Sequence, residues 1–321
     1  MPLAAVTGRN VKLVMIGGKG GVGKTTCASA IALGLADRGW KVLLISSDPT
    51  PSLSDIFEKQ IGSEEKRILE NGSLYGLEIS SEIVLKKWKE RFGEEIYEVV
   101  SSFANVDYAF VDYIGTAPGI EEEYMLYYIL ELVRGGKYDL VVWDTAPAGH
   151  TLRLLRLPHL FLDHLEAATK FYMNMYSFIE RFKDTVKLKS SRRSLMKIIG
   201  SWEALSRDII EFIGNRELTR YVLVTIPEAL GVRLTERMIK DLEDNQLSVD
   251  DLIINHVVKE ADCEFHRRRK EMQGYYIRSI EETYERTTIT KLNLSAWEVK
   301  GVERIREVAA ALLGEKNKNS N

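Results

Sequence analysis

Short runs of apolar residues recur along the chain and are typical of strands buried on both faces of a parallel sheet. They cover residues 11–16, 41–46, 138–144, 220–226 and 251–255. Between them lie longer segments with apolar residues at every third or fourth position, which is typical of amphipathic helices. This alternation predicts an α/β fold in which helices flank a mostly parallel sheet.

Two segments with helical periodicity interrupt the alternation, at residues 81–133 and 158–213. We interpret them as an α-helical subdomain inserted into the sheet domain. The expected division is a lead over residues 1–10, a core from 11–80, 134–157 and 214–314, and a disordered tail over 315–321.

The inserted helices carry more apolar residues than one packed face requires. The residues in question are Met125, Tyr128, Phe171, Met173, Tyr176 and Phe178. They suit either a core, within the subdomain or between subunits, or a groove for an apolar peptide, since flexible methionines adapt to variable ligands. The basic stretch over residues 181–197 suits either a solvated helical face or a partner site.

A glycine-rich segment at residues 17–26 follows the first apolar run and precedes an alanine-rich helical pattern. It fits the phosphate-loop pattern G-x-x-x-x-G-K-[ST] at Gly18, Gly23, Lys24 and Thr25. Lys24 would neutralise the β- and γ-phosphates of ATP, and the Thr25 hydroxyl would bind Mg²⁺. The expected nucleotide-binding residues of the loop are Gly18, Lys19, Gly20, Gly21, Val22, Gly23, Lys24, Thr25 and Thr26. An ordinary phosphate loop has no use for Lys19.

Polar residues end three later strands, at the sheet edge where ligands of α/β folds gather. Asp48 would orient or deprotonate the attacking water, or else cap the turn that it opens with Pro49. Asp144 is the expected carboxylate on the magnesium side, bound directly or through water. Asn255 would read an adenine edge or end its strand as a turn residue.

Residues 145–151 follow Asp144 and are expected to form a polar loop that changes shape when a γ-phosphate leaves. His150 in this loop suits either phosphate sensing or a structural role.

Composition narrows the class of protein. Of the 321 residues, 45% are hydrophobic and 28% are charged, as in ordinary globular proteins. The net charge of −3 gives no sign of nucleic-acid binding. No apolar run reaches the roughly 18 to 20 residues of a membrane span, so we expect a cytoplasmic protein. Cys27 and Cys263 are too far apart in sequence to suggest a disulfide framework.

Taken together, these segments resemble the arsenite-pump and tail-anchored-protein-targeting ATPases. The loop at 17–26 with Lys19 resembles the family's deviant phosphate loop, and residues 48–55 and 144–153 resemble its two switches. Further matches lie at 118–122, 226–228, 235–237 and 298–301, so the similarity extends over about residues 11–313.

The resemblance implies a homodimer, or a higher oligomer built from it, that binds two ATP molecules face to face. Lys19 would reach the nucleotide of the partner, and Asp48 would assist the attacking water. Thr25 and Asp144 would lie on the Mg²⁺ side, and Asn255 would contact adenine. In the targeting branch, closure of the dimer joins the helical insertions into a groove for one C-terminal transmembrane helix. Such a protein hands its client to a membrane receptor and is peripheral at the membrane only during delivery.

Residue counts favour the targeting branch over a pump-driving ATPase stimulated by arsenite or antimonite. As(III) prefers about three sulfur ligands, whereas the chain has Cys263 and a second cysteine, Cys27, that is expected to be buried behind the loop. The pump enzymes also carry two ATPase halves, and this sequence has one phosphate loop. A partitioning or positioning ATPase is a further alternative, although it would need a membrane helix or a basic face.

The targeting branch commonly carries a Cys-x-x-Cys pair that binds zinc at the dimer interface. Cys263 and His266 stand at the matching place, and two subunits would supply a Cys₂His₂ set for Zn²⁺. The alternative is a dimer contact without metal. A second departure is Pro51, where the first switch of the family usually has histidine.

Overall fold

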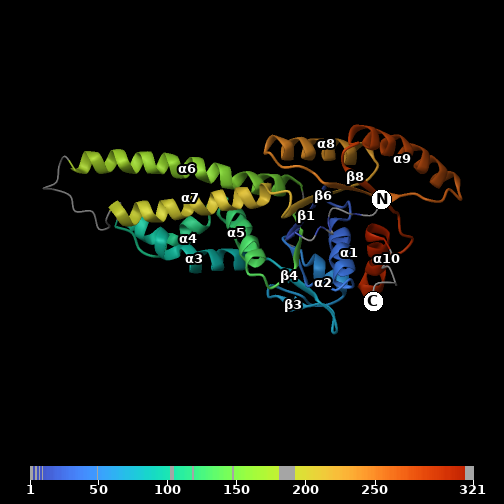
Figure 1. The fold of residues 1–321 in the computed structure, drawn as a ribbon, viewed down its shortest axis with the longest axis horizontal. Coiled ribbons are helices and arrows are strands. Elements are labelled where there is room, and N and C mark those ends of the chain that lie inside the picture. The colour runs from blue at the N-terminus through green and yellow to red at the C-terminus, as the bar shows by residue number, and fades with distance from the viewer. Residues whose placement is uncertain are drawn as a thin grey trace. The chain divides into compact units, whose positions relative to one another are not determined.

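The computed structural model describes residues 3, 6, 8, 10–48, 50–101, 105–117, 119–146, 148–180 and 192–314. Within these ranges, the side chains of residues 148–154, 168, 171, 172, 175–180 and 192–195 are not described. The expected disordered tail at 315–321 lies outside the described residues. By their internal contacts, residues 1–80, 131–152 and 213–321 form one unit, the sheet unit, and residues 81–130 and 153–212 form a second, the helical unit (Figure 1).

The sheet unit contains an eight-stranded sheet of order β3-β4-β2-β5-β1-β6-β7-β8, parallel except at the β3–β4 pair. The five predicted strands are β1 (Leu13–Gly18), β2 (Val42–Ser46), β5 (Leu140–Asp144), β6 (Thr219–Thr225) and β7 (Asp251–Val257). Three short strands were not predicted: β3 (Lys66–Arg67), β4 (Leu74–Glu78) and β8 (Thr288–Asn293). The predicted α/β fold with a mostly parallel sheet is thus confirmed.

Helices cover both faces of this sheet (Figure 1). On one face lie α1 (Lys24–Ala36), α2 (Ser52–Phe57) and α10 (Gly301–Leu313), which share a core with the strands. On the other lie α8 (Ala229–Asp244), against β6, and α9 (Glu264–Thr283), against β7. Gly34 lets α1 and α10 approach closely, because a Cβ at this position would lie 2.6 Å from Leu313 Cδ1.

The helical unit contains α3 (Ser81–Ser101), α4 (Phe110–Gly115) and most of α5 (Ile120–Arg134), α6 (Ala148–Glu180) and α7 (Arg192–Gly214). The last residues of α5 and α7 and the first residues of α6 belong to the sheet unit. The predicted loop over residues 145–151 is wrong from Ala148 onward, where α6 already begins. Proline is tolerated at the start of a helix, so the Pro147 signal did not exclude one. The helix also continues through Pro158, at the expense of one backbone hydrogen bond. Among the described residues, no helix is long and apolar enough to cross a membrane.

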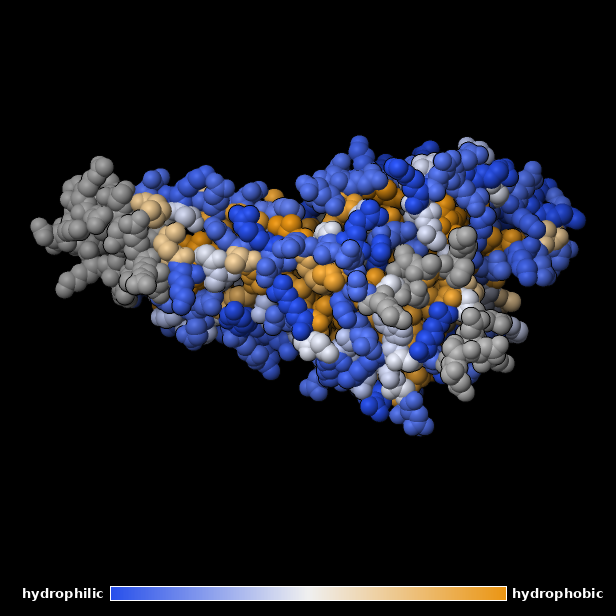
Figure 2. Space-filling model, viewed as in Figure 1, coloured by the Kyte–Doolittle hydropathy of each residue, from blue (hydrophilic) through white to orange (hydrophobic). Residues whose placement is uncertain are grey.

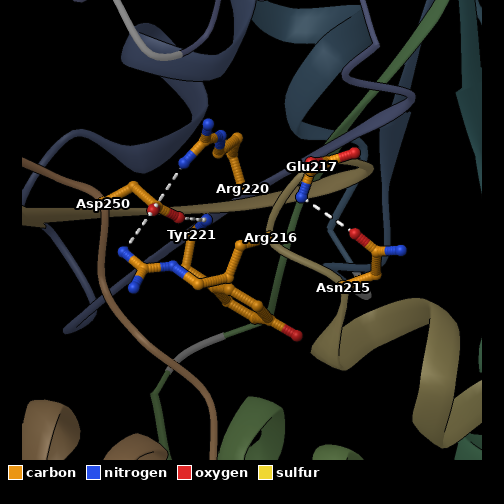
Figure 3. A network of polar contacts seen from close by, with 6 residues as sticks. All are labelled: Asn215, Arg216, Glu217, Arg220, Tyr221 and Asp250. Atoms are coloured by element: carbon orange, nitrogen blue, oxygen red, sulfur yellow. Dashed lines mark hydrogen bonds and ion pairs between the residues drawn. The ribbon is translucent and has the colours of Figure 1, made fainter.

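A buried carboxylate joins the starts of β6 and β7 (Figure 3). Asp250 accepts hydrogen bonds from Arg220 Nη1 at 2.7 Å, Arg216 Nη2 at 3.1 Å and the backbone N–H of Tyr221 at 3.3 Å. The next residue, Asp251, is 0% exposed, and neither of its carboxyl oxygens bonds to another described residue. Burial, reinforced by the charge of Asp250, raises the pKa of Asp251 to about 7.

Candidate active site

The loop between β1 and α1 has positive φ angles at Gly18, Gly21 (φ +79°) and Gly23, which favour glycine. At Gly18 (φ +152°) a Cβ would lie 2.4 Å from the carbonyl oxygen of Val224, and at Gly23 (φ +92°) it would lie 2.4 Å from Asn255 Nδ2. Gly20 and Gly21 instead have open space where a Cβ would project. The loop therefore offers an accessible backbone at the N-terminus of α1, where N–H groups can bind phosphate oxygens.

Lys24 is a buried cation at the base of this loop. It is 7% exposed, and its Nζ donates a hydrogen bond to the carbonyl oxygen of Lys19 at 3.3 Å. Burial lowers the pKa of the Lys24 ammonium even though Asp144 and Asp48 attract its proton. An anion beside it would offset that cost of burial, so the site fits a phosphate group.

Thr25 and Asp144 come together at the ends of two neighbouring elements. Thr25 Oγ1 donates a hydrogen bond to Asp144 Oδ2 at 2.6 Å, while Asp144 Oδ1 is buried without a partner among the described residues. Burial raises the pKa of Asp144 to about 6, despite the Thr25 hydrogen bond and the charge of Lys24. A hydroxyl beside a carboxylate with an unused oxygen is a donor set that fits Mg²⁺.

Asp48 follows β2 and makes the turn contact that was one of its two expected roles. Its Oδ1 accepts hydrogen bonds from the Thr50 backbone N–H at 3.0 Å and from Thr50 Oγ1 at 2.7 Å. Asp48 also acts electrostatically on both Lys24 and Asp144, so the three charges belong to one site. Its role toward an attacking water remains a prediction.

Glu78 anchors the segment after Asp48, and sequence reasoning missed it. Its carboxylate accepts hydrogen bonds from the backbone N–H groups of Leu53 and Ser54 at 2.9 and 2.8 Å, at the start of α2. It also accepts one from Ser54 Oγ at 2.7 Å. A carboxylate at a helix N-terminus is favoured by the helix dipole, so Glu78 fixes where α2 begins. Only the parallel pairing of β4 with β2 brings it there.

Asn255 joins β7 to the phosphate loop. The strand continues to Val257, so the expectation that Asn255 ends it as a turn residue is wrong. Its Nδ2 donates to the Val22 carbonyl oxygen at 2.9 Å, and its Oδ1 accepts from the His256 backbone N–H at 2.8 Å. Asn255 also lines a cavity of about 470 Å³ beside Thr25 and Thr26. The amide thus holds the loop in place, and its contact with adenine remains a prediction.

The far wall of this cavity comes from the segment after β8, which sequence reasoning missed as part of the site. Leu294 and Trp297 line it and are 50% and 68% exposed. The β-branched residues Thr288, Ile289 and Thr290 in the sequence are the signal that could have identified this strand. Lys19, by contrast, is half-buried in the loop, and its side chain makes no hydrogen bond or ion pair with another described residue.

The structure describes the side chains of only some of the residues predicted to line a client groove. Met125 is 6% exposed, Met173 is half-buried, and Tyr128 is half-buried with Lys87 Nζ 4.9 Å from its ring centroid. The side chains of Phe171, Tyr176, Phe178 and His150 lie outside the described residues. The groove is therefore still a prediction.

Cys263 and His266 lie together at the start of α9, with Asp262 as a third member that sequence reasoning missed. Potential ligand atoms of the three residues lie within 4.8 Å of one another, and His266 Nδ1 is 2.5 Å from Asp262 Oδ1. Cys263 and Asp262 are exposed. The cluster supplies thiol, imidazole and carboxylate ligands of the kinds that bind Zn²⁺.

Comparison with known proteins agrees with this geometry. Residues 11–314 match the family described as anion-transporting ATPase. An ATPase named GET3 from Phaeosphaeria nodorum is 29% identical over 305 residues, which cover 93% of this chain and 94% of that protein. An ATPase ASNA1 homolog from Entamoeba histolytica is 30% identical over 309 residues, covering 94% of this chain and 93% of that protein. The chain therefore belongs to the anion-transporting ATPase family and is an ATPase.

Proposed function

We propose that this ATPase works as a homodimer that shields the C-terminal transmembrane helix of tail-anchored membrane proteins and delivers them to a membrane receptor. The proposal rests on the resemblance to the targeting ATPases, and the relatives named GET3 and ASNA1 support it. ATP hydrolysis drives opening of the dimer and release of the client.

The site residues have these proposed roles. Backbone N–H groups of residues 18–26 and the Lys24 ammonium bind the β- and γ-phosphates, and Asp48 orients the attacking water. Thr25 and Asp144 would hold Mg²⁺, which neutralises phosphate charge when it is bound. Lys19 acts on the nucleotide of the partner subunit.

The observation that carries the proposal is the chain connection between Asp144 and α6. The strand β5 ends at Asp144, and α6 begins at Ala148 and continues to Glu180 in the helical unit. A rearrangement beside the γ-phosphate thus acts on the first turn of a helix of 33 residues. At 1.5 Å per residue this helix is about 50 Å long, enough to cover the roughly 30 Å of a transmembrane helix.

Apolar surface on the helical unit supports the same proposal. On the face seen in Figure 2, hydrophobic surface is exposed among hydrophilic residues over this unit. Leu160 on α6 is 49% exposed and Phe110 on α4 is 39% exposed. Such surface is the kind that an apolar helix covers on binding.

Co-expression with a tail-anchored membrane protein tests the proposal. We expect a soluble complex on size-exclusion chromatography, and loss of client from it when Met173→Asp places a charge among the proposed groove residues. Leu230→Asp on α8 is the matched control, since it adds the same charge at an exposed leucine of the sheet unit. Absence of a soluble complex, or equal client retention by the two variants, would contradict the proposal.

A pump-driving ATPase stimulated by arsenite or antimonite is the second candidate, favoured by the description of the family as anion-transporting. The thiols argue against it: Cys27 is buried with a pKa raised to about 12, which leaves Cys263 as the exposed thiol. Stimulation of ATP hydrolysis by arsenite that disappears in Cys263→Ser would replace the first proposal by this one.

A further inference from the structure

The helices of the helical unit line a cavity of about 210 Å³. Side chains from α3, α4, α5, α6 and α7 form its walls. Six of them are aromatic: Trp88, Phe92, Tyr124, Tyr127, Phe161 and Trp202. Apart from the tyrosine hydroxyls and the indole N–H groups of Trp88 and Trp202, the polar groups among the described lining residues are Glu123 and Ser206.

Glu123 is the unusual member of this lining. Its carboxyl makes no hydrogen bond or ion pair with another described residue, and burial raises its pKa to about 8. Glu123 lies half-buried in the first turn of α5, and this partial burial in an apolar wall disfavours the charged form of its carboxyl. A ligand that brings a donor or a positive charge would stabilise that charged form.

Arg91 is a cation beside this wall, since it contacts the lining residues Tyr127 and Phe92, and it already has partners. Arg91 on α3 hydrogen-bonds to Tyr127 and to Glu95, the latter at 3.3 Å, and its guanidinium lies 4.8 Å from the ring centroid of Phe92. Glu95 also accepts a hydrogen bond from Trp202 Nε1 at 2.7 Å. These contacts hold α3 and α7 together beside the cavity and leave Glu123 outside the network.

We propose that this cavity binds a small lipophilic organic cation, with its ammonium group at Glu123 and its apolar body between the aromatic rings. Aromatic faces attract cations, and the attraction is strongest where water is excluded. A cavity of about 150 Å³ is large enough for benzene, so about 210 Å³ accepts a benzene ring with a small ammonium group. The cavity is lined by residues of the helical unit of one chain, and the inference uses the cavity lining rather than the residues proposed for the client groove.

Binding is expected to depend on pH in a defined direction. Only the ionised carboxylate pairs with a cation, so binding releases a proton from Glu123 below about pH 8. The affinity then rises about tenfold per pH unit up to about pH 8 and is constant above it. The other titratable lining groups are Tyr124 and Tyr127 on α5, and burial raises the pKa of Tyr124 further above neutrality. The described lining residues from α3, α4, α6 and α7 include no titratable group.

Two probes of the same shape test the proposal on the full chain. Phenyltrimethylammonium and tert-butylbenzene differ by one positive charge, and Trp88 and Trp202 report binding through their fluorescence. At pH 8.5 we expect the cation to bind at least tenfold more tightly than the hydrocarbon. Equal affinities, or no binding of the cation, would overturn the proposal.

Two variants test whether the preference for the cation comes from the Glu123 side chain. Glu123→Gln should weaken binding of phenyltrimethylammonium at least tenfold and leave tert-butylbenzene binding unchanged. Glu122→Gln, at the neighbouring position outside the lining, should bind both probes as the unaltered protein does. Equal loss in the two variants contradicts the assignment. If Glu123→Gln does not fold, the pH dependence of binding to the unaltered protein provides the test. The same affinity for the cation at pH 6.5 and pH 8.5 would overturn the proposal.

Discussion

Lys19 is the residue that most sharply separates this phosphate loop from an ordinary one. Its backbone carbonyl binds Lys24, but its side chain has no hydrogen bond or ion pair within the described part of its own chain. We predict that Lys19→Ala slows hydrolysis in the partner's site by roughly 10²- to 10³-fold, as expected for removal of one charged donor at a reacting group.

Mixed dimers measure this effect. One subunit carries Lys24→Ala, which disables its own site, so all turnover comes from the other subunit. Lys19→Ala added to the disabled subunit should slow turnover by this factor, whereas Lys19→Ala placed on the active subunit should not. The reverse pattern would show that Lys19 acts on its own nucleotide.

Asp251 gives a prediction about stability rather than activity. Its pKa of about 7 in the folded state lies above the ordinary aspartate value of about 4, so the folded protein binds the proton more tightly than the unfolded chain. The stability that the folded protein gains from binding this proton is fully present below about pH 4, falls as pH rises, and is lost above about pH 7.

Asp251→Asn removes that dependence, because the amide carries no charge. We expect the free energy of unfolding, measured in urea, to rise at pH 8 by on the order of 2–4 kcal/mol relative to the unaltered protein. At pH 4 the two proteins should be nearly equal. Asp244→Asn, at an exposed position of α8, is the control and should have no such effect. A similar difference at both pH values would contradict the assignment.

At the scale of elements, the packing of α1 on α10 depends on one glycine. A Cβ at Gly34 would lie 2.6 Å from Leu313 Cδ1 and 3.0 Å from Ala309 Cβ. Alanine normally stabilises a helix interior relative to glycine by roughly 0.5–1 kcal/mol. Gly34→Ala is expected to destabilise instead, by roughly 1–3 kcal/mol, because the helices must separate.

Gly274→Ala on α9 is the matched variant, since the nearest atom to its Cβ is Arg278 Nη1 at 3.6 Å. It should stabilise the protein or leave it unchanged. We therefore expect the midpoint temperature of thermal unfolding to fall in Gly34→Ala and to rise or stay the same in Gly274→Ala. Stabilisation by Gly34→Ala would contradict the packing argument.

The sequence predicted those elements whose own residues carry the signal. The five strands found in advance lie inside the sheet, where both faces are covered and the apolar run is continuous. The edge strand β8 buries only one face, and β4 is interrupted by Gly76, so neither gave a continuous run. The start of α6 was misplaced because Pro147 and Gly149 also occur in loops.

The site was predictable to the extent that its contacts are local. The loop from Gly18 to Thr26 and the carboxylates Asp48 and Asp144 follow from motif and strand-end position. Glu78 and Trp297 act at the site only because distant segments fold beside it. Asp262 joins Cys263 and His266 through a side-chain contact that their motif does not include.

At the scale of the whole molecule, the cluster at the start of α9 predicts a metal that joins two chains. We expect one Zn²⁺ per purified dimer by elemental analysis, since Cys263 and His266 of two subunits complete a tetrahedral set. Cys263→Ser should remove the zinc and weaken dimerisation, measured by analytical ultracentrifugation. Cys27→Ala, at the buried cysteine, should retain the zinc. A zinc-free dimer of unchanged affinity would contradict the prediction.

The shortest strand has a consequence for solubility. An open sheet edge offers unpaired backbone groups on which another extended chain can add, and this is a route to aggregation. Here one edge is β3, which consists of two exposed basic residues, Lys66 and Arg67. An incoming strand finds little backbone to pair with and two charges to desolvate. The two-residue, basic strand β3 thus protects that edge of the sheet from pairing with another extended chain.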